Sequence, residues 1–281
     1  MTETIVKTWA ITGASSGIGL AVTRQLLEQG NKVIALVRSP QKLQSLKSRY
    51  AGQLIIMALD LSQTERIAAT IQAAFKTVGT IDVILNAAGY ALVGAAEELS
   101  EPDITTHIET NLLAPIFITK AALPFLRAQK RGHIMHISSE GGHITYPSAS
   151  IYHASKWGAE GFFDALAKEV QALNIAVTLI EPGRIKTGFD DHAQVTNIAI
   201  EDYRKTAVGA YFRLLAMGRF PMIGDVEKVA TRIIETSLLP KPPLRLVLGS
   251  DSYKNITRET QKRLDSFVTQ AETAAQTDAE E

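Results

Sequence analysis

The stretch Trp9-Ala-Ile-Thr-Gly-Ala-Ser-Ser-Gly-Ile-Gly19 decides the fold. An apolar, strand-like segment runs into a glycine-rich turn, and a helical pattern begins at Gly17. Glycines let the backbone turn tightly and approach a pyrophosphate, while a helix N-terminus offers that anion free N–H groups and the positive end of a dipole. The spacing G-x-x-x-G-x-G differs from the usual G-x-G-x-x-G, but its place between a first strand and a first helix predicts a dinucleotide-binding turn. The residues expected to contact the dinucleotide here are Gly13, Ser15, Ser16, Gly17, Ile18 and Gly19.

Apolar runs alternate with helical patterns through the rest of the chain. The expected strands are 9–12, 33–37, 54–58, 82–85, 133–137, 176–180 and 245–248. The expected helices are 17–29, 40–50, 65–78, 101–126, 150–173 and 226–236. Most of the strands are continuous apolar runs, which suit a parallel sheet buried on both faces. The alternation predicts an α/β fold of the Rossmann-like, doubly wound kind, with a seven-stranded, mainly parallel sheet, helices on both faces and a single domain over residues 1–281.

Two segments interrupt this alternation. Residues 184–224 form a long insertion, and long insertions in compact domains often form lids or binding loops. Its apolar and aromatic side chains are Tyr203, Tyr211, Phe212, Leu214, Leu215, Met217, Phe220 and Met222. We expect them to form an apolar substrate pocket, with packing of the insertion onto the core as the alternative. Residues 271–281 are rich in alanine, threonine and acidic residues and are expected to be disordered.

The composition limits the classes of partner. Lys+Arg and Asp+Glu both number 29, and a net charge of zero gives no electrostatic reason to expect a nucleic acid. The chain contains no cysteine, which excludes disulfides and thiolate chemistry and is consistent with a cytoplasmic location. The N-terminus, Met1-Thr-Glu-Thr4, lacks the features of a signal peptide, and no apolar run reaches the roughly 20 residues of a membrane span.

The end of the second strand predicts which dinucleotide binds. A carboxylate is expected there to hold the ribose 2′-hydroxyl of NAD, but Val37 takes this place and Arg38 follows it. A guanidinium suits the additional 2′-phosphate of NADP through charge-assisted hydrogen bonds, each worth about 1.5–3 kcal/mol. The sequence therefore favours NADP(H) over NAD(H), and a solvated surface arginine is the alternative interpretation of Arg38.

A tyrosine and a lysine four residues apart form the candidate catalytic pair. Tyr152 and Lys156 share one face of the helix expected over residues 150–173. A free tyrosine has a pKa of about 10, and a neighbouring ammonium group favours the phenolate and lowers that pKa toward the range in which general acid–base groups work. Tyrosine and lysine at this spacing also recur by chance on helix surfaces, so the pair alone is weak support.

Seven segments, in order, make the chain resemble the single-domain branch of the short-chain dehydrogenase/reductase family. They are Thr12-Gly-Ala-Ser-Ser-Gly-Ile-Gly19, Asp60-Leu61, Asn86-Ala-Ala-Gly89, Asn111, Ser138-Ser139, Tyr152-x-x-x-Lys156, and Pro182-Gly183 with Thr187. They span nearly the whole chain, and their joint order is much more specific than any one of them. The resemblance implies a nicotinamide-dependent oxidoreductase that interconverts a carbonyl and an alcohol and assembles as a homodimer or homotetramer.

The resemblance also implies roles for single catalytic residues. Ser139, in preference to its neighbour Ser138, would hydrogen-bond the substrate oxygen, and Tyr152 would exchange a proton with that oxygen. Lys156 would bind the nicotinamide ribose and tune the tyrosine. Asn111 would hold a water in a proton relay to Lys156, with a structural hydrogen bond to the backbone as the alternative.

Further positions would contact the cofactor if the resemblance holds. Asp60 would accept a hydrogen bond from the adenine amino group, with a cap of the following helix as the alternative. Alanine stands at position 88, where the family often has a second asparagine, and little effect is expected. The remaining positions implied are Leu61, Asn86, Ala87, Gly89, Pro182, Gly183, Ile185 and Thr187.

Other polar residues near these motifs receive no role. Glu140 directly follows the candidate serine and could contact a polar substrate, but we expect it to face solvent. The histidines of the strand over 133–137 are three residues apart and therefore lie on opposite faces. His143 and His153 are expected in loops or at the surface. Because no histidine or carboxylate has the spacing of a metal site, no metal is predicted.

Together these features predict an NADP(H)-dependent oxidoreductase that interconverts a carbonyl and a primary or secondary alcohol on a small, apolar substrate. Tyr152 would be its general acid/base. A catalytically silent NADP(H)-binding sensor or scaffold is one alternative. A dehydratase or epimerase that retains its cofactor is another.

Overall fold

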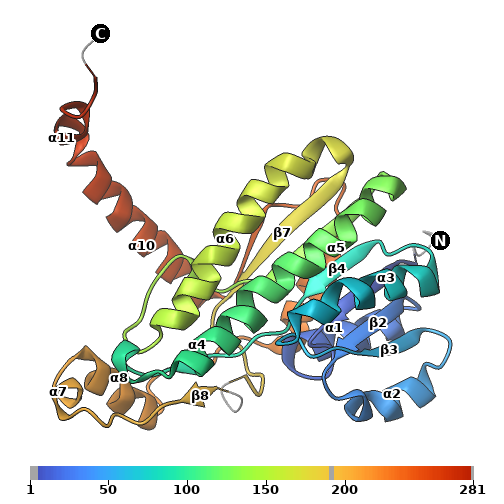
Figure 1. Cartoon of the computed structure of the whole chain (residues 1–281), viewed down its shortest axis with the longest axis horizontal. Helices are drawn as coiled ribbons and strands as arrows, with labels where there is room; N and C mark the ends of the chain where they lie inside the picture. The colour runs from blue at the N-terminus through green and yellow to red at the C-terminus, as the bar shows by residue number, and fades with distance from the viewer. Residues whose placement is uncertain (1–5, 190–192, 280–281) are drawn as a thin grey trace.

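The apolar strands form one sheet at the centre of the molecule (Figure 1). The computed structural model describes residues 6–189 and 193–279, so the expectation for Met1–Thr4 lies outside the described residues. The strands are β1 (Thr8–Thr12), β2 (Lys32–Val37), β3 (Leu54–Ala58), β4 (Val83–Asn86), β6 (Gly132–Ile137), β7 (Ile175–Pro182) and β9 (Arg245–Leu248). They pair in the order β3-β2-β1-β4-β6-β7-β9, and every pair is parallel. The predicted seven-stranded, doubly wound sheet is confirmed.

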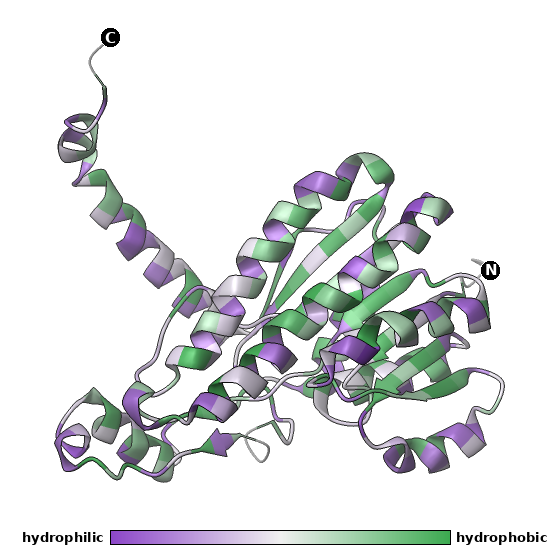
Figure 2. Cartoon of the chain, in the orientation of Figure 1, coloured by the Kyte–Doolittle hydropathy of each residue, from purple (hydrophilic) through white to green (hydrophobic). Residues whose placement is uncertain are grey.

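Helices cover both faces of the sheet, because each face buries its own apolar cluster. One face carries α3 (Ile67–Val78), α5 (Ala114–Gln129) and α6 (Ser150–Val170), and the other carries α1 (Gly17–Glu28) and α9 (Val226–Ser237). Helix α4 (Glu101–Ile108) precedes α5 and contacts α6. The rings of Phe75 and Phe125 stack 4.4 Å apart where α3 meets α5. Figure 2 shows the strands as the most hydrophobic part of the chain, which agrees with burial on both sides.

The helix expected over residues 101–126 is divided into three parts. A five-residue π-helical turn, Glu109–Leu113, separates α4 from α5. Pro115 lies in the first turn of α5, where its missing N–H group is least costly. The segment expected as a helix over 40–50 likewise divides into a 3-10 turn (Pro40–Leu43) and α2 (Gln44–Arg49). Short 3-10 turns at Thr64–Arg66 and Gln171–Leu173 flank α3 and α6.

The insertion over residues 184–224 has its own local structure. It begins and ends side by side, because Ile185 pairs with Gly224 in a parallel bridge. Between these residues lie β8 (Gln194–Val195), α7 (Glu201–Arg204) and α8 (Ala207–Ala216). Strand β8 pairs with β5 (Leu92–Val93), so the insertion is joined to the chain that follows β4.

The C-terminal region differs from the expectation. Helix α10 (Ser250–Val268) was not predicted, since its sequence is mostly polar and Ser252 is its one fully buried residue. It projects away from the sheet and is coloured mainly hydrophilic in Figure 2. The tail expected to be disordered forms α11 (Ala271–Ala275), because alanine has the highest helix propensity. Among the described residues, none of the helices combines the length and apolarity that a bilayer crossing requires.

Candidate active site

A cavity of about 320 Å³ lies beyond the carboxyl ends of β1, β4, β6 and β7. Its walls are the chain segments that follow these four strands, together with α6 and part of the insertion. The volume lies within the range of about 300–1,000 Å³ that is usual for small-molecule sites. Ligands of open α/β sheets bind in the crevice beyond the strand ends, so this cavity is the candidate active site.

The glycine-rich turn brings three segments of the chain into contact. Gly13 has φ +66° and Gly17 has φ +50°, a region that residues with a Cβ seldom adopt. A Cβ on Gly19 would lie 2.4 Å from the Gly13 carbonyl oxygen, and one on Gly13 would lie 2.9 Å from the backbone of Ala88. A Cβ on Gly17 would lie 3.5 Å from Thr187. The turn after β1 therefore touches both the segment after β4 and the segment after β7.

The residues beside this turn fit a dinucleotide. Ser16 is the N-cap residue of α1, and its side chain forms no hydrogen bond to the N–H groups in the first turn of the helix. Those N–H groups can therefore bind a ligand. The side chain of Asn86 is 2% exposed, yet neither its oxygen nor its nitrogen has a partner among the described residues. A buried amide without a partner is costly, which favours a bound group or water there. Arg38 lies exposed directly after β2 and forms no hydrogen bond or ion pair with the described part of the chain.

The structure brings most of the predicted site residues to the cavity. Those that line it are Ser16, Gly17, Ile18, Ala87, Gly89, Ser139, Tyr152, Lys156, Pro182, Gly183, Ile185 and Thr187. Those that do not line it are Gly13, Ser15, Gly19, Arg38, Asp60, Leu61, Asn86 and Asn111. Arg38 and Asp60 follow the ends of the paired strands β2 and β3, at the same edge of the sheet. The Asp60 carboxylate accepts hydrogen bonds from the backbone and hydroxyl of Ser62, whereas the N-cap of the following Thr64–Arg66 turn is Gln63, so these bonds do not cap a helix and the contact of Asp60 with adenine stays a prediction.

Tyr152 and Lys156 lie in the first turns of α6 and both line the cavity. The Lys156 Nζ atom is 5.8 Å from the centre of the Tyr152 ring and donates a hydrogen bond of 2.8 Å to the Ile137 carbonyl oxygen. Lys156 is only 5% exposed. Burial lowers the pKa of its ammonium group to about 8, although the charge of Glu160 opposes this.

The two neighbouring serines after β6 have different surroundings. The hydroxyl of Ser138 donates a hydrogen bond to the buried Glu160 carboxylate. The Ser139 oxygen accepts a hydrogen bond of 3.0 Å from the Gly141 backbone N–H group, so its own proton is available to a ligand. This difference favours Ser139 over Ser138 as the residue that contacts a substrate oxygen.

Asn111 lies in the π-helical turn and is 1% exposed. Its side chain bonds both backbone groups of Tyr90, at 3.2 Å and 2.9 Å, and lies 3.1 Å from the His107 ring. These contacts match the structural alternative for Asn111, and its role in a proton relay stays a prediction. His107 was not singled out from the sequence. Burial, aided by the charge of Lys156, lowers the pKa of His107 to about 4, so its ring is neutral near pH 7.

The expectation that Glu140 faces solvent is wrong. It belongs to the 3-10 turn Glu140–Gly142, lines the cavity and is 7% exposed. One carboxylate oxygen accepts a hydrogen bond of 3.0 Å from the Tyr146 hydroxyl, and the other accepts one of 2.9 Å from the Asn255 amide. Since Asn255 lies on α10, the C-terminal helix that was not predicted reaches the wall of the candidate site.

The surface location expected for His153 is also wrong. His153 is 4% exposed on α6, where one ring nitrogen lies 2.9 Å from the Gly141 carbonyl oxygen. The other accepts a hydrogen bond of 2.8 Å from the Tyr146 backbone N–H group. The two bonds hold the turn after Ser139 against α6. Burial therefore gives this histidine a structural role that its position in the sequence does not show.

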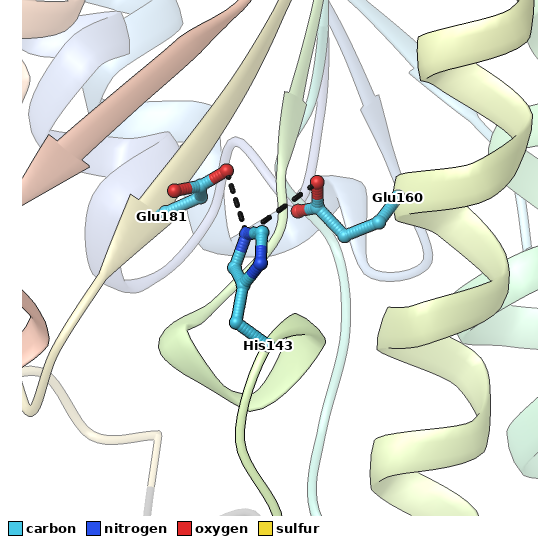
Figure 3. Close-up of side chains that lie close together, drawn as sticks. All are labelled: His143, Glu160 and Glu181. Atoms are coloured by element: carbon cyan, nitrogen blue, oxygen red, sulfur yellow. Dashed lines mark hydrogen bonds and ion pairs between the residues drawn. The ribbon is translucent and has the colours of Figure 1, made fainter. Parts of the chain in front are cut away.

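A second polar cluster lies behind this turn (Figure 3). His143 Nε2 is 3.0 Å from a Glu181 carboxylate oxygen and 3.7 Å from one of Glu160, and the three residues come from the loop, β7 and α6. Such a group could ligate a metal ion, and sequence spacing missed it because its members are far apart in the chain. However, the Arg245 guanidinium lies 3.2 Å from Glu160 and 3.3 Å from Glu181, on the same carboxylate oxygens that face His143, so it already occupies the place of a cation there.

The insertion supplies much of the apolar wall of the cavity. Of the side chains predicted to form a pocket, Tyr211, Leu215, Phe220 and Met222 line it. The rings of Tyr211 and Phe220 lie 5.2 Å apart, which fixes α8 against the chain that follows it. Leu214 and Met217, in contrast, are 43% and 65% exposed. One face of the insertion therefore lines the cavity, and its contact with a substrate stays a prediction.

Comparisons with known proteins agree with this geometry. The profile of the short chain dehydrogenase family matches residues 7–197. Oxidoreductase BOA17 of Botryotinia fuckeliana is 35% identical over 251 residues, which cover 89% of this chain and 91% of that protein. A short-chain dehydrogenase of Streptomyces avermitilis superposes with a TM-score of 0.88 at 30% identity, covering 99% of this chain and 100% of the other. A metagenomic short-chain oxidoreductase in complex with NADP superposes with a TM-score of 0.69 at 26% identity, covering 88% and 98%.

Proposed function

The chain belongs to the short-chain dehydrogenase family, and we propose that it is an NADP(H)-dependent oxidoreductase that interconverts a carbonyl and an alcohol on a small, mainly apolar substrate. The observation that carries the proposal is the convergence of Ser139, Tyr152 and Lys156 on one cavity at the strand ends. A carbonyl oxygen in this cavity can accept hydrogen bonds from the hydroxyl groups of Ser139 and Tyr152, and the Lys156 ammonium group lies close to the Tyr152 ring.

The proposed proton transfer runs through Tyr152. In the direction of reduction, its hydroxyl gives a proton to the substrate oxygen, and the resulting phenolate is stabilised by the Lys156 ammonium group. Ser139 donates a hydrogen bond to the same oxygen and so favours the charge that develops on it. NADPH, when bound, supplies the hydride. Asn111 acts as a positioning residue in this scheme, because it fixes the segment after Gly89.

The proposed cofactor is NADP(H) rather than NAD(H). The Arg38 guanidinium is exposed at the end of β2 and available to a 2′-phosphate, and a solved relative at 26% identity is a complex with NADP. The glycine turn and the N-terminus of α1 would hold the pyrophosphate. Thr187 and the Pro182–Gly183 segment, which lie beside that turn, would hold the nicotinamide end.

The proposed substrate is shaped by the insertion. Tyr211, Leu215, Phe220 and Met222 make the wall opposite the strand ends apolar, which suits a lipid-like, steroid-like, retinoid-like or aromatic carbonyl compound. A cytoplasmic homodimer or homotetramer is part of the same proposal, by resemblance to the family. The silent sensor or scaffold is the alternative function, and the convergence of proton-transfer groups favours an enzyme over it.

A matched pair of variants tests the proposal. The purified protein is incubated with NADPH and a panel of aromatic and aliphatic ketones and aldehydes, and the loss of NADPH is followed. We expect turnover in wild type, and a loss of about a hundredfold or more in Tyr152→Phe with NADPH binding retained. Wild type that binds NADPH but reduces nothing in the panel would instead support the sensor.

A further inference from the structure

One wall of the cavity carries a carboxylate that the proposed reaction does not use. Glu140 directly follows Ser139, and neighbouring Cα atoms are only about 3.8 Å apart. Glu140 is among the residues that line the cavity, it is only 7% exposed, and its carboxylate is bonded to Tyr146, another lining residue. A buried carboxylate is costly unless hydrogen bonds or a cation compensate for the lost hydration, so its presence beside the reacting groups needs an explanation.

The hydrogen bonds of Glu140 are only partly satisfied within the chain. Tyr146 and Asn255 each donate one hydrogen bond, and they use different oxygens of the carboxylate. A carboxylate accepts about four hydrogen bonds, so each oxygen keeps the capacity for another. Burial and the charge of Glu140 raise the pKa of Tyr146, so the Tyr146 hydroxyl stays a donor at neutral pH.

Glu140 also forms no ion pair with the described residues. The cations that line the described part of its cavity are Lys156 and Arg184. Lys156 donates a hydrogen bond to the Ile137 carbonyl oxygen and is stabilised by the charge of Glu160, and the Arg184 guanidinium lies over the Phe220 ring. Arg258 acts on Tyr146 from α10, but it is 59% exposed and pairs with Glu259. Within residues 6–189 and 193–279, the Glu140 carboxylate is therefore held by hydrogen bonds from neutral donors and by no ion pair.

We propose that Glu140 is a specificity-determining residue that binds a protonated amine on the substrate, a few bonds from the reacting carbonyl carbon. This inference rests on the proposed function. Ser139 and Tyr152 hold the carbonyl oxygen, and Glu140, the next residue in the chain, receives the ammonium group of the same molecule. The apolar part of the substrate then extends along Tyr211, Leu215 and Phe220. The substrate class is an amino ketone, or the matching amino alcohol, with an apolar body.

Two pairs of ketones with matched shape test this proposal. One pair is 2-(dimethylamino)acetophenone and 3-methyl-1-phenylbutan-1-one, and the other is 3-(dimethylamino)propiophenone and 4-methyl-1-phenylpentan-1-one. Each pair differs in an ammonium group replaced by a neutral carbon branch. We expect wild type with NADPH to have a kcat/KM for at least one amine about tenfold to a hundredfold above that of its neutral partner, mainly through a lower KM. Added salt should raise the KM of the amine more than that of the neutral ketone.

Two variants separate binding from structure. In Glu140→Gln, which keeps the shape of the side chain, the preference for the amine should fall to about one or below. The exposed carboxylate of Glu235 on α9 provides a control with the same change of charge, and Glu235→Gln should keep the wild-type preference. The readout is the ratio of the kcat/KM values for two substrates of the same enzyme, so a general loss of activity does not change it.

The outcomes distinguish this inference from the proposed function. If wild type reduces neither ketone of either pair, the proposed function itself fails. If it reduces both members of each pair equally well, or if Glu140→Gln keeps the preference, the protein is a carbonyl reductase and Glu140 only ties α10 to the catalytic loop. The wild-type ratios alone can overturn the inference, so it is testable even if the variant does not fold.

Discussion

The buried ammonium group of Lys156 should make the stability of this protein rise at alkaline pH. Its pKa is about 8 in the folded protein, against 10.5 for an unburied lysine. Between these values the unfolded chain binds a proton that the folded protein does not bind, so the free energy of unfolding increases with pH. At about 1.4 kcal/mol per pH unit, the full difference corresponds to about 3 kcal/mol.

The perturbation that isolates this effect is Lys156→Met, which keeps a long side chain in the same space without a charge. The variant also loses the hydrogen bond to Ile137, but that loss does not depend on pH. Other groups titrate in both proteins. The difference in stability between wild type and variant should therefore change in favour of wild type by about 3 kcal/mol from pH 8 to pH 10.5.

Urea unfolding of both proteins without cofactor, at several pH values from 7 to 10.5, measures this difference. Below pH 8 the two curves should run parallel, since Lys156 is protonated in both states of wild type. A difference that stays constant over the whole range would refute the reasoning. The folded pKa of Lys156 would then be close to 10.5, and its burial would not destabilise the charged form.

Three further substitutions test single parts of the site. Arg38→Ala should lower kcat/KM for NADPH about tenfold to a hundredfold and leave that for NADH nearly unchanged, and equal values for the two cofactors in wild type would contradict the role of Arg38. Ser139→Ala should lower kcat/KM about a hundredfold or more. Ser138→Ala should mainly lower the free energy of unfolding, by about 1–3 kcal/mol, because the buried Glu160 carboxylate loses a hydrogen-bond donor. If kinetics and thermal unfolding showed the reverse pattern, the two serines would exchange roles. Gly19→Ala should abolish the change in NADPH fluorescence on binding, because the new Cβ would lie 2.4 Å from a backbone oxygen. The control Gly161→Ala has open space around its Cβ and should bind NADPH normally. Equal binding by the two variants would show that the glycine turn does not hold the cofactor.

The sheet could be predicted because its physical signal is local. Strands buried on both faces must be apolar at nearly every position, and the strands expected over 33–37 and 82–85 match β2 (Lys32–Val37) and β4 (Val83–Asn86), which are buried at nearly every position. Helix α10 has a weaker signal. Its few apolar side chains, Tyr253, Ile256, Leu264 and Phe267, recur at helical spacing, but they stand among polar residues and three of them are more than half exposed, so the segment was not predicted as a helix.

Some residues of the candidate site could likewise be predicted from the sequence, and others could not. The residues of the glycine turn, Tyr152 and Lys156 stand in short motifs whose spacing carries the chemistry, and they line the cavity or support it. The burial of Glu140 depends on Asn255, which lies 115 positions later in the chain. The cluster of His143, Glu160 and Glu181 likewise exists only after folding. Contacts between distant segments leave no trace in spacing, so sequence reasoning placed these residues at the surface or gave them no role.

Hydride transfer is the central claim, and an isotope measures it most directly. NADPH carrying deuterium at C4 of the nicotinamide, on one face and then on the other, is supplied with a ketone that the protein reduces. The account predicts that one of the two labelled cofactors places a single deuterium on the carbinol carbon of the product, and that Tyr152→Phe binds the cofactor but forms no labelled alcohol. Consumption of NADPH without label in the alcohol, or an unchanged rate of labelling in Tyr152→Phe, would contradict it.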